Sequence, residues 1–230
     1  DHRDLHLSLR RQRQMCIRDS AHGVEIRELT VIGGETGILL NNSNSNTISD
    51  CKIYFNNLNG IFAKSSNNNT ISNCRVSGNM LGIRIERGNN NTISKCNIYS
   101  NKGVGILLLT NSSNNIISKC NITKNGRGME LTMSNNNIIY LNNFIGNGIN
   151  VFDHSHNVYD NGKEGNYWDD YKGKDLNGDS IGDTSYKGID YYPLMEPWKE
   201  GKQDNNTPGF EMLFLIVAIV IVLIIKKSKR

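Results

Sequence analysis

Apolar residues recur between residues 21 and 160 in a unit that repeats every 22 to 24 residues. Each unit opens with a segment of the type Gly-Ile-x-Leu, in which apolar side chains alternate with others, and continues with a segment of the type Ile-x-x-Cys-x-Ile. Alternation with a period of two predicts a β-strand with one inward face. The alternation of the second segment breaks once, which predicts two short strands that meet at a bend.

The tracts between these segments are rich in Asn and Ser, residues that tolerate turns and left-handed backbone. Self-similar units of so short a period form a solenoid, because no unit can bury its apolar face alone. Three short strands and three turns per unit predict an all-β parallel β-helix of about five full coils with partial ends, in which stacked Asn side chains hydrogen-bond from coil to coil. The copies open at Gly37, Gly60, Gly82, Gly105 and Gly128.

A leucine-rich repeat is the alternative fold, because Ile71, Cys74, Val76, Asn79 and Leu81 also match its consensus spacing. That fold would require a helix, or a tight turn with further spaced leucines, after this segment. A second alternating strand and an Asn tract follow instead, so the β-helix is favoured.

Four cysteines take the same place in successive units: Cys51, Cys74, Cys96 and Cys120. Leu29 takes that place in the first unit, which predicts an inward, small, apolar slot. Neighbouring coils bring the α-carbons roughly 4.7–4.9 Å apart. Parallel in-register side chains keep their β-carbons near that spacing, wider than the ~3.8 Å that a disulfide prefers. Metal ligands would have to converge rather than stand in line. Buried free thiols are therefore favoured over disulfides or a metal site.

The repeat ends before residue 161, and residues 161–198 carry large aromatic side chains, among them Tyr167, Trp168 and Tyr171. An uncovered end of a β-helix is an exposed edge, so this segment is predicted to cap the coils.

Oxygen-bearing side chains recur at alternate positions within the same segment. This spacing favours a tight loop around a hard cation, and we expect calcium as a cofactor, with the backbone carbonyl of Ile181 as a further ligand. A polar surface turn is the alternative, since Ser180 and Tyr186 depart from the EF-hand pattern. The expected side-chain ligands are Asp175, Asn177, Asp179 and Asp183.

The net charge of +4 is divided unevenly, with mildly basic coils and an acidic segment at residues 160–204. A mildly basic solenoid is typical of an ordinary solvated surface, so no nucleic-acid partner is expected. Residues 1–20 are rich in Arg and have no apolar period, so they are predicted to be a disordered or non-native arm outside the fold. Glycosylation sequons agree with an exported protein, and the candidate sites are Asn41, Asn68, Asn90, Asn111, Asn121 and Asn205.

The coils, the run Gly165 to Tyr171, the loop Asp175 to Asp183 and the segment Asp190 to Leu194 together resemble NosD-type right-handed parallel β-helix proteins. That family is described as periplasmic copper-binding, and also as carbohydrate-binding and sugar-hydrolase repeats common on archaeal cell surfaces. The resemblance implies a right-handed β-helix outside the cell. It transfers no copper ligands, because the coils hold no Met/His cluster; only His154 and His156 share one face of a predicted strand, where they fit surface residues better.

The C-terminus consists of a polar linker at residues 199–207, an apolar run from Met212 to Ile225, and a basic tail. As a helix this run reaches only about 21 Å, short of the ~30 Å hydrocarbon core. Residues 208–230 resemble the PGF-CTERM sorting signal, whose motif is Pro208, Gly209 and Phe210. The resemblance implies cleavage by an archaeosortase and attachment of a lipid; a short permanent membrane anchor is the alternative. Both place the coils on the outer face of the membrane.

The carboxylates of the coils, Asp50, Glu86, Glu130 and Asp153, lie in separate units. Arg84 and Glu130 share an outward column but lie roughly 9–10 Å apart by strand spacing, too far for acid–base chemistry. No catalytic residue is therefore assigned. We expect a non-catalytic surface protein that binds glycans or neighbouring surface-layer proteins. The alternatives are a polysaccharide lyase or hydrolase whose active coils are missing from this fragment, and a copper-handling accessory protein of the NosD type.

Overall fold

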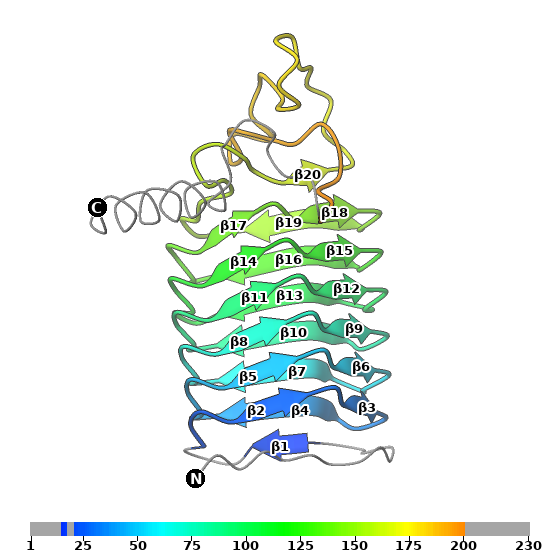
Figure 1. Cartoon of the computed structure of the whole chain (residues 1–230), viewed down its shortest axis with the longest axis vertical. Coiled ribbons are helices and arrows are strands. Elements are labelled where there is room, and N and C mark those ends of the chain that lie inside the picture. Colours follow the sequence, from blue (N-terminus) through cyan, green and yellow to red (C-terminus); the bar gives the residue numbers. More distant parts are fainter. Residues whose placement is uncertain (1–14, 18–20, 201–230) are drawn as a thin grey trace, which may run out of the picture. The chain divides into compact units, whose positions relative to one another are not determined.

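The computed structural model describes residues 15–17 and 21–200, and its β-helix and cap belong to one compact unit that ends at Trp198. The chain forms a right-handed parallel β-helix of six coils, each with three short strands and three turns (Figure 1). The described residues contain no helix, which excludes the leucine-rich repeat. The prediction of a parallel β-helix is confirmed. The sixth coil comes from the end segments that the sequence pattern predicted to be partial coils.

The longest strands stack into one seven-stranded parallel sheet, which we call the long-stranded sheet. Within residues 1–20, three residues are described, and they form a short first strand that pairs in register with the next, Met15 opposite Ile38. In spatial order the strands are β1 (Met15–Ile17), β4 (Thr36–Asn41), β7 (Asn59–Lys64), β10 (Leu81–Glu86), β13 (Val104–Leu109), β16 (Arg127–Thr132) and β19 (Ile149–Asp153).

Shorter strands make the other two sheets. The threonine-rich sheet contains β2 (Glu25–Arg27), β5 (Thr47–Ser49), β8 (Thr70–Ser72), β11 (Thr92–Ser94), β14 (Ile116–Ser118) and β17 (Ile138–Tyr140). The third sheet continues into the cap and contains β3 (Thr30–Ile32), β6 (Lys52–Tyr54), β9 (Arg75–Ser77), β12 (Asn97–Tyr99), β15 (Asn121–Thr123), β18 (Asn143–Ile145) and β20 (Tyr167–Trp168).

The two short strands of a coil meet at a bend that contains one residue in the left-handed region. Asn73 has a φ of 54° between β8 and β9, and Lys95 has a φ of 54° between β11 and β12. This bend explains the single break in the apolar alternation, because it lets the side chains of Ile71, Cys74 and Val76 all point into the core. The predicted bend is confirmed.

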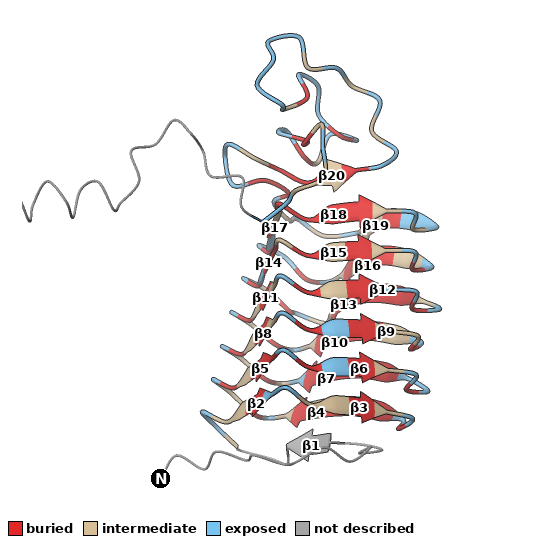
Figure 2. Ribbon diagram, turned by 45° about the vertical axis from the view of Figure 1, so that its right-hand side comes forward, coloured by how far each residue is buried: buried red, intermediate tan, exposed pale blue. Residues whose placement is uncertain are grey.

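The core consists of columns of inward side chains that stack in register from coil to coil. Figure 2 shows that buried residues recur in the strands of successive coils. The cysteine column belongs to it: Cys51, Cys74, Cys96 and Cys120 are free thiols with no exposed surface. Each thiol donates to a backbone carbonyl two residues earlier, as Cys74 does to Ser72 over 3.2 Å. Hydrogen bonding with Cys120 and burial raise the pKa of Cys96 well above its usual value, which disfavours the reactive thiolate. The interpretation as buried free thiols is confirmed.

The glycine that opens each copy is required by close approach between coils. A β-carbon on Gly105 would lie 2.6 Å from the carbonyl oxygen of Gly128 and 2.9 Å from Nδ2 of Asn125. These glycines have ordinary negative φ values or extended backbone, so space and not backbone conformation excludes a side chain. The same contact with the next coil recurs at Gly37, Gly60, Gly82 and Gly128.

Buried Asn side chains form two long ladders along the solenoid, as the sequence predicted. In a typical rung, Oδ1 of Asn91 accepts hydrogen bonds from the backbone N–H of Asn69 at 2.9 Å and from its Nδ2 at 3.0 Å. The amides thus form hydrogen bonds with one another and with the turn backbone, and buried polar groups require such partners. The first ladder runs through Asn46, Asn69, Asn91, Asn115 and Asn137, and the second through Asn56, Asn79, Asn101, Asn125 and Asn147.

A stack of aromatic rings closes the C-terminal end of the core, where the sequence predicted a cap. Phe144 of the last coil stacks on Trp168 with ring centroids 4.3 Å apart, and Trp168 stacks on Tyr186 at 4.2 Å. Trp168 is 1% exposed and pairs in register with Phe144 in the third sheet. The cap therefore continues an inward column of the coils and ends it with large flat rings.

Asp190 is a buried carboxylate that holds this cap together. Its Oδ2 accepts hydrogen bonds from Nε1 of Trp168 at 2.8 Å and from the backbone N–H of Asn166 at 2.7 Å, and its Oδ1 accepts from the N–H of Tyr192. Burial raises the pKa of Asp190 to about 6, although these hydrogen bonds act in the opposite direction.

We expect the stability of the cap to fall as the pH rises from about 4 to about 6. The folded carboxyl of Asp190 binds its proton more tightly than the unfolded one, so its contribution is fully present below the unfolded pKa of 3.8 and is lost through the folded pKa. Unfolding in urea should be compared for the native protein and Asp190→Asn at several pH values. The difference between the two should shrink by up to about 3 kcal/mol across this range. A difference that is constant with pH would contradict the prediction.

Several expected features lie outside the described residues: the linker beyond residue 200, the sequon at Asn205, the motif Pro208, Gly209 and Phe210, and the apolar run up to Ile225. Among the described residues, none belongs to a helix that could span a bilayer. The membrane attachment stays a prediction.

Candidate functional site

The outward face of the long-stranded sheet carries a row of side chains that are apolar or charged. Because successive residues of a strand point to opposite faces, the residue between two core positions points outward. In register from coil to coil, that position is taken by Leu39, Phe62, Arg84, Leu107, Glu130 and Phe152. We call these six residues the outward row.

Each arginine of this face covers an aromatic ring and is paired with a carboxylate. The guanidinium of Arg84 lies 4.6 Å from the centroid of the Phe62 ring and 2.5 Å from Oε2 of Glu86. Arg127 repeats the arrangement at the other end of the row, over Phe152 at 4.6 Å and 2.7 Å from Glu130. The face therefore presents flat, partly apolar patches whose charges are balanced.

The carboxylates of the coils do not form a catalytic pair. Arg84 and Glu130 are two coils apart with Leu107 between them, as predicted. Asp50 lies exposed at a bend with a φ of 55°, and Asp153 accepts a hydrogen bond from the hydroxyl of Tyr159 at 2.8 Å. Such an arrangement can bind a ligand through contacts along the row, and no two of these carboxylates converge on one point for acid–base chemistry.

A hollow of about 300 Å³ lies at the N-terminal end of this face, over β4 and β7. Leu39, Leu58 and Phe62 form its apolar part. Its polar part includes Asn59, which is 1% exposed, and the exposed side chains of Glu35 and Lys64. Its volume is at the lower limit for small-molecule pockets, which start at about 300 Å³.

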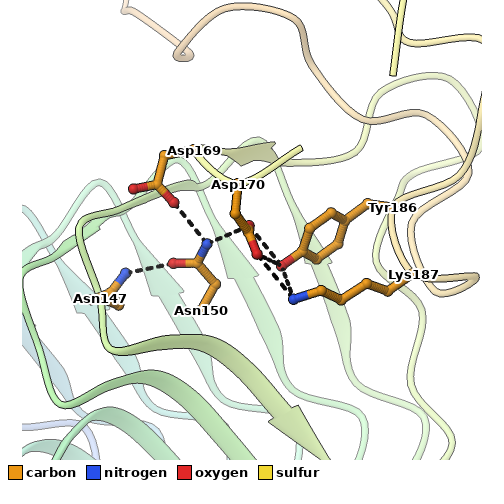
Figure 3. Close-up of polar contacts among 6 residues, drawn as sticks. All are labelled: Asn147, Asn150, Asp169, Asp170, Tyr186 and Lys187. Carbon is orange, nitrogen blue, oxygen red and sulfur yellow. Dashed lines mark hydrogen bonds and ion pairs between the residues drawn. The ribbon is translucent and has the colours of Figure 1, made fainter. Parts of the chain in front are cut away.

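A second polar cluster joins the last coil to the cap (Figure 3). Nδ2 of Asn150 donates to Asp169 at 2.9 Å and to Asp170 at 2.8 Å, and Asp170 accepts from the hydroxyl of Tyr186 and from Lys187. Burial raises the pKa of Tyr186 to about 12. Partial burial alone would raise the pKa of Asp170, but the hydrogen bonds from Lys187, Tyr186 and Asn150 lower it below its usual value. Because Tyr186 is buried and stays protonated, the cluster fits a structural link better than a catalytic centre.

The predicted calcium loop folds as a set of turns closed by its own side chains. Asp175 accepts hydrogen bonds from the backbone N–H groups of Gly178 at 2.6 Å and Ser180 at 2.8 Å, and Asp183 accepts from Leu176. Desolvation alone would raise the pKa of Asp175, but these backbone hydrogen bonds lower it below its usual value. Asn177 and Asp179 bond to each other, with Nδ2 of Asn177 donating to Asp179 at 3.0 Å. In the described part of the chain, no three His, Cys, Asp or Glu side chains are placed to hold a metal ion together. Calcium binding here stays a prediction.

The remaining candidate residues lie on the surface or in ladders. The ring of His154 packs edge-on against Phe152 at 4.4 Å, and His156 is exposed. Of the sequons, Asn121 is engaged in an amide ladder, where its Nδ2 donates to Asn97 and its Oδ1 accepts from Asn143. Asn41 ends β4, while exposed turn positions with left-handed backbone are taken by Asn68, Asn90 and Asn111.

Comparison with known proteins agrees with this architecture. The sequence profile of the family described as "Periplasmic copper-binding protein (NosD)" matches residues 7–173. The match extends over more than half of the chain, and the protein belongs to this family. The family's description names copper, and among the described residues no three His, Cys, Asp or Glu side chains are placed to hold a metal ion together. A comparison with curated proteins finds no match.

The similar solved structures include two polysaccharide epimerases and a pectate lyase. The periplasmic alginate epimerase AlgG is 25% identical, with a TM-score of 0.50 over 58% of this chain and 35% of its own. The A-module of the mannuronan C-5 epimerase AlgE6 from Azotobacter vinelandii is 18% identical, with a TM-score of 0.51 over 61% and 48%. Pectate lyase Pel9A is 14% identical, with a TM-score of 0.54 over 64% and 49%. The match thus spans about half or less of each of these proteins, and the two less identical ones share the fold alone.

The outward row was largely missed by sequence reasoning, which singled out only Arg84 and Glu130 on this face. A signal was present in the sequence. Leu39, Phe62, Leu107 and Phe152 are apolar residues at positions where the alternation predicts exposure to solvent.

Proposed function

We propose that this protein binds a polysaccharide chain along the outward row without altering it. The observation that carries the proposal is the repetition of a flat apolar side chain beside a balanced charge along one sheet face. Sugar rings have apolar faces edged by hydroxyl groups, so they fit a surface that combines aromatic faces with placed polar groups. The likeness to the alginate epimerase AlgG supports a polysaccharide as the ligand.

The absence of converging carboxylates in the described coils supports binding without catalysis. Glu86 and Glu130 are each held by an arginine, and Leu107 separates Arg84 from Glu130. The family's description as periplasmic supports a location outside the cytoplasm. Display on the outer face of a membrane, attachment to it, and binding of surface-layer proteins belong to the same proposal.

The test is electrophoresis of the protein through gels that contain one of several neutral or acidic polysaccharides. Native protein should be retarded in at least one gel, and Phe152→Ala should bind about fivefold more weakly, since an aromatic contact contributes about 1 kcal/mol. Tyr99→Ala is the matched control, because Tyr99 is an exposed aromatic residue of the third sheet.

The bound polysaccharide should be recovered with unchanged chain length and sugar composition. Retardation that Tyr99→Ala removes and Phe152→Ala preserves would move the binding face to the third sheet. New chain ends or epimerised units in the recovered polysaccharide would favour the alternative of a carbohydrate-active enzyme.

A further inference from the structure

Two buried side-chain polar atoms among the described residues have no hydrogen-bond partner, and both lie on the outward side of the long-stranded sheet. They are Oδ1 of Asn59 and Nε of Arg84. Asn59 belongs to β7 and Arg84 to the adjacent strand β10, where Arg84 is in register with Phe62. Unpartnered buried polar atoms are rare in folded proteins, so two of them on adjacent strands call for an explanation.

The contacts of the two residues leave one acceptor and one donor unused. The Asn59 amide donates through Nδ2 to the hydroxyl of Thr36 at 3.0 Å, and its oxygen accepts no hydrogen bond. Arg84 uses Nη2 for its ion pair with Glu86, and its Cζ lies over the Phe62 ring, while its Nε–H donates to no acceptor. Each atom has lost water without gaining a bond, and a ligand group that reaches it recovers that loss.

Asn59 and Phe62 also line the hollow over β4 and β7. The rim of the hollow carries one carboxylate, Glu35, and one ammonium group, Lys64. Beside the hollow, Glu86 pairs with Arg84 and, at 3.7 Å, with the exposed Arg87. The two charged side chains that line the hollow itself, Glu35 and Lys64, are of opposite sign and leave the lining without net charge. A ligand with hydroxyl groups and no net charge fits this balance better than an anionic one.

We propose that the hollow is a subsite for a single neutral hexopyranose unit of the bound polysaccharide. The apolar face of the sugar ring packs on Leu39 and on the part of the Phe62 ring that the Arg84 guanidinium leaves uncovered. Small side-chain movements uncover the two buried atoms. One hydroxyl group then donates to Oδ1 of Asn59, and a hydroxyl oxygen on the opposite side of the sugar ring accepts from Nε of Arg84, which stands on the adjacent strand beside the hollow. This inference rests on the proposed function and adds the position and the charge class of one sugar unit.

The test measures binding by calorimetry with the full chain, using neutral hexasaccharides of glucose, mannose and galactose, and a hexauronate of the same length. At least one neutral hexasaccharide should bind, and more tightly than the hexauronate. Asn59→Ala and Phe62→Ala should each weaken binding about five- to tenfold, the effect of about one hydrogen bond or ring contact.

Arg84→Lys tests the donor separately, because lysine keeps a positive charge beside Glu86 and lacks Nε–H. It should weaken binding severalfold. Asn59→Ala also removes the hydrogen bond from Nδ2 to Thr36, so its urea midpoint should fall whether or not the hollow binds sugar, and the affinity is the deciding measurement. A purely structural role for Asn59 would lower the midpoint and leave the affinity unchanged.

The outcomes separate this inference from the proposed function. If Phe152→Ala weakens binding while Asn59→Ala, Phe62→Ala and Arg84→Lys do not, the face binds polysaccharide and the subsite is wrong. Equal or tighter binding of the hexauronate overturns the neutral-sugar assignment. If none of the oligosaccharides binds, this inference and the proposed function fail together.

Discussion

Gly105→Ala will lower the free energy of unfolding by about 3 kcal/mol, at the upper end of the usual cost of overpacking. The new methyl group would lie 2.6 Å from the backbone carbonyl of Gly128, which cannot move without displacing the next coil. It would also press on Nδ2 of Asn125 and so disturb a rung of the second Asn ladder. Urea unfolding followed by far-ultraviolet circular dichroism measures the effect.

Gly33→Ala is the matched control for this substitution. Gly33 has a φ of 74° and open space around its α-carbon. Alanine there should lower the free energy of unfolding only by the strain of a left-handed backbone, about 1 kcal/mol. If Gly105→Ala is as mild as Gly33→Ala, contact between coils is not the reason for the glycine column.

Trp168→Ala will destabilise the protein by about 4 kcal/mol and make it aggregate. The loss combines the cavity left by a fully buried ring with the removal of a hydrogen-bond donor from the carboxylate of Asp190. Once the stack is broken, the Phe144 ring and the last strands are no longer covered, and an uncovered sheet edge or core end promotes association. Chemical unfolding and light scattering measure the two effects.

Trp198→Ala is the control, because Trp198 is the second of the two tryptophans and contacts Asn143 through its backbone. Its side chain is only partly buried, so alanine there should cost much less. Similar losses for the two variants would show that stacking on Phe144 is not what secures the cap.

Local periodicity explains why the coils could be predicted. The alternation of Ile83 and Ile85 and the repeated Asn tracts depend on neighbours within one unit, and the fixed period then sets the register of all units. The cap could be placed by its aromatic residues, but the use of Asp190 as their common acceptor could not be predicted. It joins Trp168 to a residue 22 positions later in a segment that has no repeat.

The candidate site was predicted less well for a physical reason. Sequence reasoning searched for charged residues, and it placed Arg84 and Glu130 on one face correctly. The features that suit that face to ligand binding surround these two residues. They are the rings of Phe62 and Phe152 under the guanidinium groups and the unused amide oxygen of Asn59. Unused hydrogen-bonding capacity depends on the placement of every neighbour, so no single-residue pattern contains it.

The Asn ladders also bear on how such a protein can change over generations. Each Asn presents its oxygen to the coil before and its N–H groups to the coil after, so every junction between coils offers the same connection. Removal or duplication of one whole coil reconnects the ladders, the glycine contacts and the core columns at once. A deletion of half a coil breaks all three. The natural unit of gain or loss is therefore a complete turn, and the length of the binding face can be altered without redesign of the fold.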